Sequence, residues 1–345
     1  MPRLLATAMF ALSLATSGAG AAMHSRRAAL SSFALRSVPL PGEGRGDYLA
    51  VDPVARRLYV THTSQVHVLD LDHLTAIATI GNLTAAHGVA LDTASGHGFI
   101  TDGKQDAVLM FDIASDKSLK LIAVGKGPDS ILRDGASGRV FVFNRGSSDV
   151  SVIDPATGTV GATIRLPDGP ESAQADDHGK LWANLDEGNA IAEIDTRSMN
   201  MVRIFALTGC EGPAPMAFDR ANRVLFSGCG NHVMTATDAD TGKVLARIPV
   251  GDDPDGIVFD PVRKRILVGN RGGSWTVVTQ RSRSSYRVER SLKVEPYAKT
   301  MALDPRTHRV FTSTATLVWP PAVAGKKYLP NAAAGSFHLL VVSEK

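Results

Sequence analysis

Short stretches of alternating apolar and polar residues recur along the whole chain at a regular spacing. The clearest marker is an apolar pair followed by Asp, a turn and a second apolar strand, as in Ala50-Val51-Asp52-Pro53. Successive copies lie 40 to 44 residues apart, which gives a period of about 42 residues. Self-similarity at such a period is typical of repeat architectures. The marker residues are Asp52, Asp92, Asp134, Asp176 (the weakest copy), Asp219, Asp260 and Asp304.

A second motif keeps the same period and completes the repeat. Short alternating strands end in Asp at Val68-Leu69-Asp70, Val152-Ile153-Asp154 and Ala236-Thr237-Asp238, and turns such as Asp154–Gly158 follow them. Each repeat therefore holds four short strands with period-two patterning and no convincing helix. Four strands in about forty residues are typical of a propeller blade. Seven copies predict an all-β chain that forms a seven-bladed β-propeller with four-stranded antiparallel blades.

The last blade needs a strand from the other end of the chain. After the strands at 311–314 and 337–342 no fourth strand follows, whereas 33–38 has strand character near the N-terminus. We expect this N-terminal strand to join the C-terminal blade and so close the ring without an open sheet edge. Residues 22–345 then form a single domain. A Pro-rich insertion at 319–330 interrupts the last blade, and its role is left open.

The first residues predict a signal peptide over 1–21. Arg3 precedes a mostly apolar run from Leu4 to Ala15, and the small residues Ala19-Gly20-Ala21 suit a signal peptidase. This run is too short to span a bilayer, and no later stretch is long enough. We therefore expect a periplasmic or secreted protein. In such an oxidising compartment Cys210 and Cys229, the two cysteines of the chain, are candidates for a disulfide bond.

Net charge is small but unevenly distributed. The chain carries a formal charge of +3, which does not indicate a nucleic-acid-binding protein. Residues 261–345 nevertheless hold 15 Lys and Arg against 4 Asp and Glu. Positive charge on an edge strand protects against sheet-to-sheet aggregation, and an anionic partner is the alternative explanation. The basic residues of blade six are Arg281, Arg283, Arg287, Arg290 and Lys293.

The repeats resemble the YVTN family of propeller repeats found in YncE-like exported proteins. The resemblance is carried by Arg57–His62, Arg139–Asn144, Val150–Asp154 and Arg265–Asn270. It runs from about residue 47 to residue 345. It implies the propeller fold but no single activity, because relatives with this architecture include binding proteins, lactone hydrolases and domains of redox enzymes.

The repeat register also predicts which side chains surround the axial opening. Five residues before the marker Asp stand Asp47, His87, Asp129, Glu171, Ala214, Asp255 and Lys299. The loop between the second and third strands contributes His62, Asp102, Asn144, Arg145, Asn184, Cys229, Asn270 and Arg271. We expect both sets on one face, where propellers usually bind ligands. Cys210 and Cys229 fall in these two loops of one blade, which favours the disulfide.

Three kinds of site follow from these residues. Two carboxylates and two imidazoles could hold a divalent metal, although they could equally bond to turn backbones; they are Asp47, His62, His87 and Asp102. An anionic ligand could be held by Arg145 and Arg271 across the opening, unless each Arg pairs with its neighbouring Asp, which is Asp129 for Arg145 and Asp255 for Arg271. Candidates for lining this ligand site are Asn144, Arg145, Asn184, Asn270, Arg271 and Lys299. Acid–base chemistry could use Asp129, Glu171 or Asp255.

The sequence therefore predicts an exported propeller, expected to be monomeric, that binds a small anionic ligand or a protein partner at its axial face. A lactonase-type hydrolase that uses funnel carboxylates, with or without a divalent metal, is one alternative. A scaffold that docks through the basic edge of blade six is another. Single-stranded nucleic acid is a poor candidate, because Tyr286 is the only aromatic residue near that edge.

Overall fold

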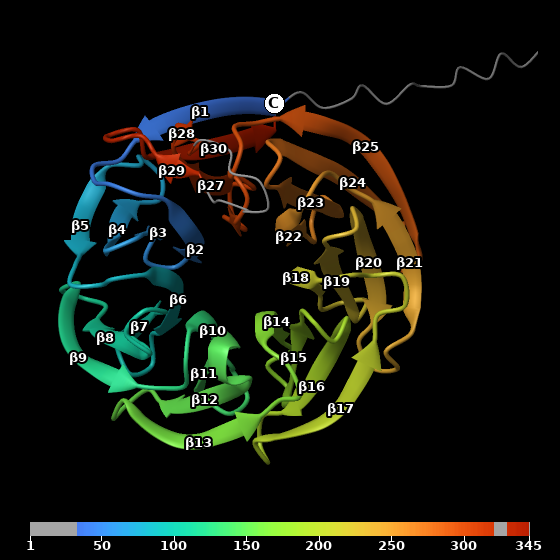
Figure 1. The fold of residues 1–345 in the computed structure, drawn as a ribbon, viewed down its shortest axis with the longest axis horizontal. Helices are drawn as coiled ribbons and strands as arrows, with labels where there is room; N and C mark the ends of the chain where they lie inside the picture. The colour runs from blue at the N-terminus through green and yellow to red at the C-terminus, as the bar shows by residue number, and fades with distance from the viewer. Residues whose placement is uncertain (1–32, 321–329, 345) are drawn as a thin grey trace, which may run out of the picture. The chain divides into compact units, whose positions relative to one another are not determined.

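The strands of the protein form seven four-stranded antiparallel sheets arranged in a ring around a central opening (Figure 1). The computed structural model describes residues 33–320 and 330–344. Within these ranges the one helical element is the 3₁₀ turn η1 (Arg145–Ser147). The predicted seven-bladed β-propeller is thus confirmed. The same ranges contain no helix of the length and apolarity that a membrane crossing requires.

The first three blades follow one another along the chain, and each runs from an innermost to an outermost strand. Blade one holds β2 (Gly46–Asp52), β3 (Arg57–His62), β4 (Gln65–Asp70) and β5 (Ala76–Ile80). Blade two holds β6 (Ala86–Asp92), β7 (His97–Asp102), β8 (Ala107–Asp112) and β9 (Lys117–Ala123). Blade three holds β10 (Pro128–Arg133), β11 (Val140–Asn144), β12 (Asp149–Asp154) and β13 (Thr159–Arg165).

Blades four to six repeat this order. Blade four holds β14 (Pro170–Ala175), β15 (Lys180–Leu185), β16 (Ala190–Asp195) and β17 (Asn200–Ala206). Blade five holds β18 (Pro213–Asp219), β19 (Val224–Cys229), β20 (Val233–Asp238) and β21 (Val244–Pro249). Blade six holds β22 (Pro254–Asp260), β23 (Arg265–Asn270), β24 (Ser274–Ser282) and β25 (Ser285–Lys293).

Blade seven combines strands from both ends of the described chain. Its inner strands are β26 (Ala302–Leu303) and β27 (Val310–Thr314), followed by β30 (His338–Glu344) and, outermost, β1 (Phe33–Pro39). β1 pairs with β30 in antiparallel register, from Phe33 opposite Glu344 to Pro39 opposite His338. A separate two-stranded ribbon, β28 (Leu317–Val318) with β29 (Asn331–Ala332), lies between β27 and β30 in the chain.

The repeated Asp residues are explained by the turns that follow the innermost strands. Asp52 Oδ1 accepts hydrogen bonds from the backbone N–H groups of Val54 and Ala55, each at 2.9 Å. Asp260 Oδ1 accepts the same pair of bonds from Val262 and Arg263. A carboxylate that bonds the backbone two and three residues ahead fixes a tight turn. The periodic Asp is therefore a structural residue, and it sets the register of each blade.

Adjacent blades are joined by apolar packing and by polar bridges. Each of seven buried apolar clusters combines side chains of two neighbouring blades, so the core is divided among the interfaces of the ring. Several marker Asp residues also bond to the next blade: Arg133 donates to Asp92 at 2.9 Å, and Arg56 donates to Asp304 at 2.9 Å. The ring is held together by these interfaces, which keeps the loops at its axial face in fixed positions.

Two sequence predictions fall outside the described residues. The predicted signal peptide, residues 1–21, is one of them. The other is the insertion at 319–330, of which only residues 319, 320 and 330 are described. The cysteines, in contrast, are described: Cys210 and Cys229 form a disulfide bond in blade five, with their Cα atoms 5.3 Å apart. This bond joins the loop before β18 to the end of β19.

Candidate functional site

The innermost strands place charged side chains around the axial opening by means of β-bulges. In blades one to six the register between the first and second strands shifts at the start of the innermost strand, for example between Gly46 and Leu49 and between Ala86 and Val89. Asp47 and His87 lie within these two bulges. A bulge redirects the side chains it contains. Here the side chains within the bulges, those of Asp47 and His87, line the central opening and do not pack between blades.

Six of the seven register positions line one cavity of about 840 Å³, which we call the funnel. Their side chains are between 12% and 32% exposed, so they are largely withdrawn from water. Ala214 of blade five is the exception. Tyr48 lines both the funnel and a second cavity of about 260 Å³. The six lining positions are Asp47, His87, Asp129, Glu171, Asp255 and Lys299.

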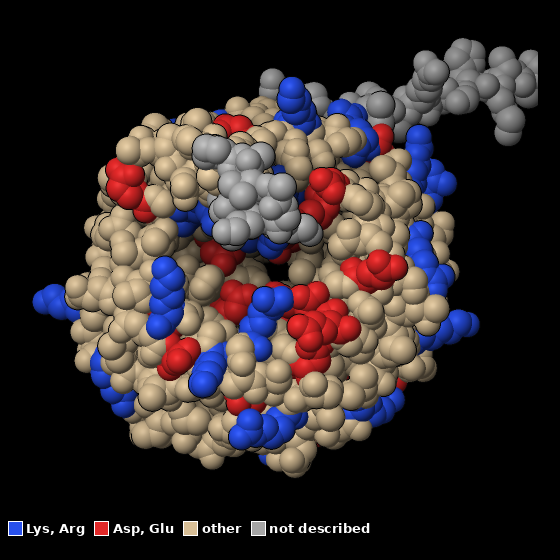
Figure 2. All heavy atoms as spheres, viewed as in Figure 1, with Lys and Arg blue, Asp and Glu red and all other residues tan. Residues whose placement is uncertain are grey.

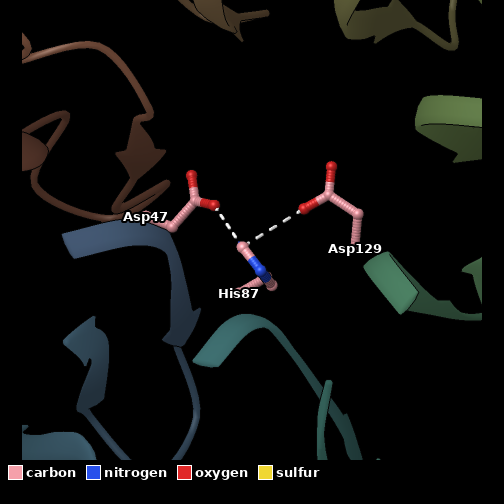
Figure 3. Close-up of side chains that lie close together, drawn as sticks. All are labelled: Asp47, His87 and Asp129. Carbon is pink, nitrogen blue, oxygen red and sulfur yellow. Dashed lines mark hydrogen bonds and ion pairs between the residues drawn. The ribbon is translucent and has the colours of Figure 1, made fainter. Parts of the chain in front are cut away.

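A chain of ion pairs with alternating sign connects these side chains. Lys299 Nζ lies 2.6 Å from Asp255 Oδ2 and 3.3 Å from Asp47 Oδ1. The other oxygen of Asp47, Oδ2, lies 2.7 Å from His87 Nδ1. That nitrogen also lies 3.5 Å from Asp129 Oδ1, so two carboxylates approach the same imidazole from either side (Figure 3). The network spans five blades, from blade six through blades seven, one and two to blade three.

The network shifts the pKa values of its members in opposite directions. Burial alone would raise the pKa of Asp47, but Lys299 and His87 outweigh it and hold that pKa well below its usual range. Burial would lower the pKa of His87, and the hydrogen bond and charge of Asp47 raise it above the ordinary value instead. Asp47 is therefore ionised at neutral pH, and the protonated imidazole of His87 is favoured beside it.

Two carboxyl groups on the other side of the funnel have raised pKa values. Burial, followed by the charge of Asp47, raises the pKa of Asp129 to about 6. Burial, followed by the charge of Asp129, raises the pKa of Glu171 to about 8 and outweighs the attraction of Arg145. Carboxyl groups with pKa values near neutrality can exchange protons under physiological conditions, and such groups cluster at functional sites. These two residues are the strongest acid–base candidates in the funnel.

Both candidate arginines are engaged with carboxylates. Arg271 forms ion pairs with Asp255 at 2.7 Å and with Asp253 at 3.3 Å. Arg145 pairs with Glu171 and, at 2.6 Å, with Asp186, both of which belong to blade four. The sequence had placed Arg145 beside Asp129, but its guanidinium reaches across to the next blade. Neither Arg stands alone as an anion-binding group.

The other predicted ligands of a metal or small molecule lie away from the funnel. His62 is 1% exposed, stacks on Phe337 at 3.7 Å, and has Nδ1 3.2 Å from His67 Nε2. Asp102 is fully buried and accepts backbone bonds from Thr84 at 2.6 Å and from Ala85 at 3.0 Å. The structure therefore does not bring these two residues to Asp47 and His87. Both end the second strand of a blade, where the side chain packs inside the blade.

The predicted asparagines are buried in the same way and hold loops. Asn144 donates to Asp149 Oδ1 at 2.7 Å and to Ser151 Oγ at 2.9 Å. Asn184 donates to the carbonyl of Pro215 at 3.1 Å, which links blades four and five. Asn270 donates to the carbonyl of Ser274 at 3.0 Å. None of the three lines the funnel.

A different metal-ligand set is present in the funnel. Asp47, His87 and Asp129 each offer one ligand atom, and these atoms lie within 4.8 Å of one another. Two carboxylate oxygens and one imidazole nitrogen suit a divalent transition metal. The metal would have to displace the proton that His87 holds between the two carboxylates. Asp129 was predicted as a catalytic candidate, and the structure adds it to the candidate ligands.

A second cavity adjoins the funnel over blades seven, one and two. It has a volume of about 520 Å³ and shares Asp47, His87, Lys104, Arg271 and Lys299 with the funnel. We call it the basic cavity, because Arg45 and Lys104 also line it and make no ion pair with any described residue. The guanidinium of Arg45 lies 5.3 Å from the ring centre of Tyr297. Sequence reasoning missed these two residues, although each stands two positions from a residue that it had selected.

The basic edge of blade six is partly used in contacts within the protein. Arg283 pairs with Asp238 at 2.6 Å, and the guanidinium of Arg290 lies 5.9 Å from the ring centre of Phe33. β25 is the outermost strand of its sheet (Figure 1). These contacts agree with a protected sheet edge and supply no specific support for docking.

Comparisons with known proteins agree on the fold. No protein-family model matches the chain. The chain is 28% identical over 170 residues to YncE of Salmonella typhi and to YncE of Salmonella typhimurium. That match covers 45% of this chain and 46% of each relative, so it spans less than half the length of these proteins.

Solved structures extend the likeness to nearly the whole ring. A chain of hydrazine synthase from Kuenenia stuttgartiensis aligns with a TM-score of 0.70 and 18% identity, over 80% of this chain and 94% of that one. The WD40 repeats of RRP9 align with a TM-score of 0.76 and 8% identity, over 90% of this chain and 97% of that one. Identities this low show a shared fold alone. Together with the seven observed blades, they show a seven-bladed β-propeller, and the sequence match adds a distant similarity to YncE over part of its length.

Proposed function

We propose that this chain is an exported binding protein that takes up a small ligand with an anionic group at its axial face. The observation that supports this most is the basic cavity, in which Arg45 and Lys104 have no acidic partner among the described residues. Lys299 and Arg271 add positive charge to the same walls. Export is inferred from the predicted signal peptide and agrees with the Cys210–Cys229 disulfide.

The anion is assigned to the basic cavity and not to the two arginines that the sequence suggested. Arg145 already serves Glu171 and Asp186, and Arg271 serves Asp253 and Asp255. Arg45 can offer its fork of donors to a carboxylate or phosphate, and Lys104 can offer a mobile point charge. A volume of about 520 Å³ falls in the range of small-molecule sites.

Calorimetric titration with inorganic phosphate and with short alkyl carboxylates tests this assignment. Arg45→Ala combined with Lys104→Ala should weaken binding by about tenfold or more, because two charge-assisted contacts are lost. A matched control removes the same charge from the outer strands β9 and β13, through Lys117→Ala and Arg165→Ala. Equal affinity of all three proteins, or an equal loss in the control, would contradict the proposal.

A lactonase-type hydrolase is the second candidate function, and the pKa values of two carboxyl groups favour it. The pKa of Asp129, at about 6, suits a general base, and that of Glu171, at about 8, suits a group that is protonated at neutral pH. That assignment of Asp129 applies to the site without a metal. A divalent ion held by Asp47, His87 and Asp129 would instead polarise a carbonyl or a water molecule. Turnover of a panel of lactones should fall at least a hundredfold in Asp129→Asn and Glu171→Gln. Unchanged turnover in both variants would remove this candidate.

A further inference from the structure

The wall of the basic cavity is cationic in one part and uncharged in another. Arg45 and Lys104 belong to the loop that leads into β2 and the loop that follows β7, in blades one and two. The part of the wall that blade seven contributes between β27 and β30 has no charged residue among those described. A ligand that fits both parts has an anionic end and an uncharged end. The lining residues of the uncharged part are Ala315, Leu317, Pro330, Asn331 and Ala332.

Trp319 follows directly after β28 in this uncharged part, and its side chain is open to solvent. It is 61% exposed, whereas Trp182 and Trp275 are fully buried. Within residues 33–320 and 330–344 every other Phe, Tyr and Trp is buried or half-buried. Aromatic side chains that remain exposed are typical of binding surfaces, because their large rigid rings make contact at a low cost in entropy. Trp319 therefore marks the uncharged part as a place where a ligand can bind.

Tyr297 connects Trp319 to the cationic part of the cavity. The Tyr297 side chain lines the cavity itself. The ring centre of Trp319 lies 6.5 Å from that of Tyr297, with the two planes at 65°, and the guanidinium of Arg45 lies 5.3 Å from the Tyr297 ring centre. The Tyr297 backbone has a left-handed φ of 62°, which is unusual for a bulky residue, and its N–H donates to the carbonyl of Arg271 at 3.0 Å. A cation and two aromatic rings thus form one continuous row, from Arg45 through Tyr297 to Trp319.

The charges around the opening favour the same direction for the ligand. Acidic side chains gather beside the central opening over blade four (Figure 2). An anionic group is repelled from that side and attracted to Arg45 and Lys104. The remainder of the ligand then lies beside Tyr297 and Trp319. The acidic residues that line the funnel but not the basic cavity are Asp129, Asp168, Glu171, Asp186, Glu187 and Asp255.

Building on the proposed function, we propose that the ligand is an aromatic acid, whose anionic group binds at Arg45 and Lys104 and whose planar ring stacks on Trp319. The guanidinium of Arg45 already lies over the ring of Tyr297, so the exposed ring of Trp319 is the better surface for stacking. Paired aromatic rings gain affinity beyond the burial of apolar area. A saturated ring of similar size buries comparable apolar area without this gain, and the difference between the two kinds of ring identifies the aromatic class.

Matched pairs of acids test the inference. Phenylalkyl carboxylates, from phenylacetate to phenylpentanoate, are compared by calorimetry at pH 7.5 with the cyclohexylalkyl carboxylates of equal chain length. For the best-fitting length, the phenyl acid should bind about fivefold more tightly. Trp319→Ala should remove this preference, and Trp319→Phe should retain most of it because an aromatic face is kept. Val262→Ala is the matched control: it shortens another exposed apolar side chain, on the turn after β22, and should keep the preference of the wild type.

The outcomes separate this inference from the proposed function. If both series bind and lose affinity in Arg45→Ala, Lys104→Ala, but the phenyl acids have no advantage at any length, the aromatic ligand is refuted and anion binding stands. If no acid of either series binds, both proposals fall. An advantage that survives in Trp319→Ala refutes the inference, and so does glucuronate if it binds as tightly as the best phenyl acid, because its ring is saturated. Fluorescence supplies a second readout: the phenyl acid should protect Trp319 from quenching by acrylamide and acetate should not, and equal quenching with both would overturn the stacking.

Discussion

Replacing Asp129 by Asn is expected to stabilise the folded protein at neutral and alkaline pH. The ordinary pKa of this carboxyl group is 3.8, and in the fold it is raised to about 6 by burial and by the charge of Asp47. At about 1.36 kcal/mol per pKa unit, ionised Asp129 costs the folded state about 3 kcal/mol. The side chain is 21% exposed, and screening by water reduces the expected gain to about 1–2 kcal/mol.

The sign of the pH dependence follows from the direction of the shift. Below pH 3.8 the group is protonated in the folded and the unfolded chain, so it costs nothing. Between pH 3.8 and 6 the folded protein keeps a proton that the unfolded chain has lost, and the stability of the wild type falls as the pH rises. Asn carries no such proton. The difference between the two proteins should therefore open across this window and persist above it.

Urea unfolding followed by tryptophan fluorescence at pH 4.5, 5.5, 6.5 and 7.5 measures this difference. Asp102→Asn is the matched control. Burial would raise the pKa of Asp102, but hydrogen bonds from the side chain and backbone of Thr84, from Gln105 and from the backbone of Ala85 outweigh it and lower that pKa. That variant should be less stable than the wild type, and by a nearly constant amount from pH 7.5 to 4.5, because the pKa of Asp102 is lowered from 3.8 and its stabilisation is lost only below this range. The reasoning is refuted if Asp129→Asn destabilises at pH 7.5, or if its effect is the same at pH 4.5 and 7.5.

Three further perturbations probe other parts of the molecule. Cys210→Ser combined with Cys229→Ser opens a loop with a sequence separation of 19 and should cost about 3 kcal/mol of unfolding free energy; a reductant should lower the urea midpoint of the wild type but not that of the variant. Lys299→Met removes the cation that Asp47 and Asp255 share. It should lower the free energy of unfolding by about 3 kcal/mol at pH 8, and adding Asp255→Asn should restore part of that loss. Additive effects of the two substitutions would speak against an interaction between Lys299 and Asp255. Zn²⁺ should raise the melting temperature more at pH 8 than at pH 6, because protons compete with the metal for His87, whose pKa lies above its ordinary value. An equal response of the His87→Gln variant would exclude Asp47, His87 and Asp129 as the metal site.

The repeat made most of the fold predictable. Asp52 and its equivalents recur because a turn needs them, and seven such turns fix the number of blades. The same register identified the residues around the opening, because the residue five positions before each marker Asp stands at the start of an innermost strand. The cysteines could be placed for a similar reason, because their two loops belong to one blade and one face.

The sequence could not show which side chains of those loops point into the opening. His62 and Asp102 belong to loops that the register places at the axial face, yet both end a second strand and pack inside their blades. Arg145 could not be assigned to Glu171 instead of Asp129, because that choice depends on the reach of a long side chain across two blades. The adjoining basic cavity depends on how blades seven, one and two meet, which no single repeat contains.

Ala214 marks the one register position at which the funnel wall has no functional group. The turn that builds this part of blade five depends on Asp219, which accepts from the backbone of Asn222 at 3.2 Å, and not on the side chain of residue 214. Scaffold and chemistry are thus encoded by different positions of the same repeat. Such a division lets evolution, or an engineer, exchange one funnel residue at a time and change the ligand without rebuilding the propeller. Residue 214 is the natural starting point for installing a new recognition group.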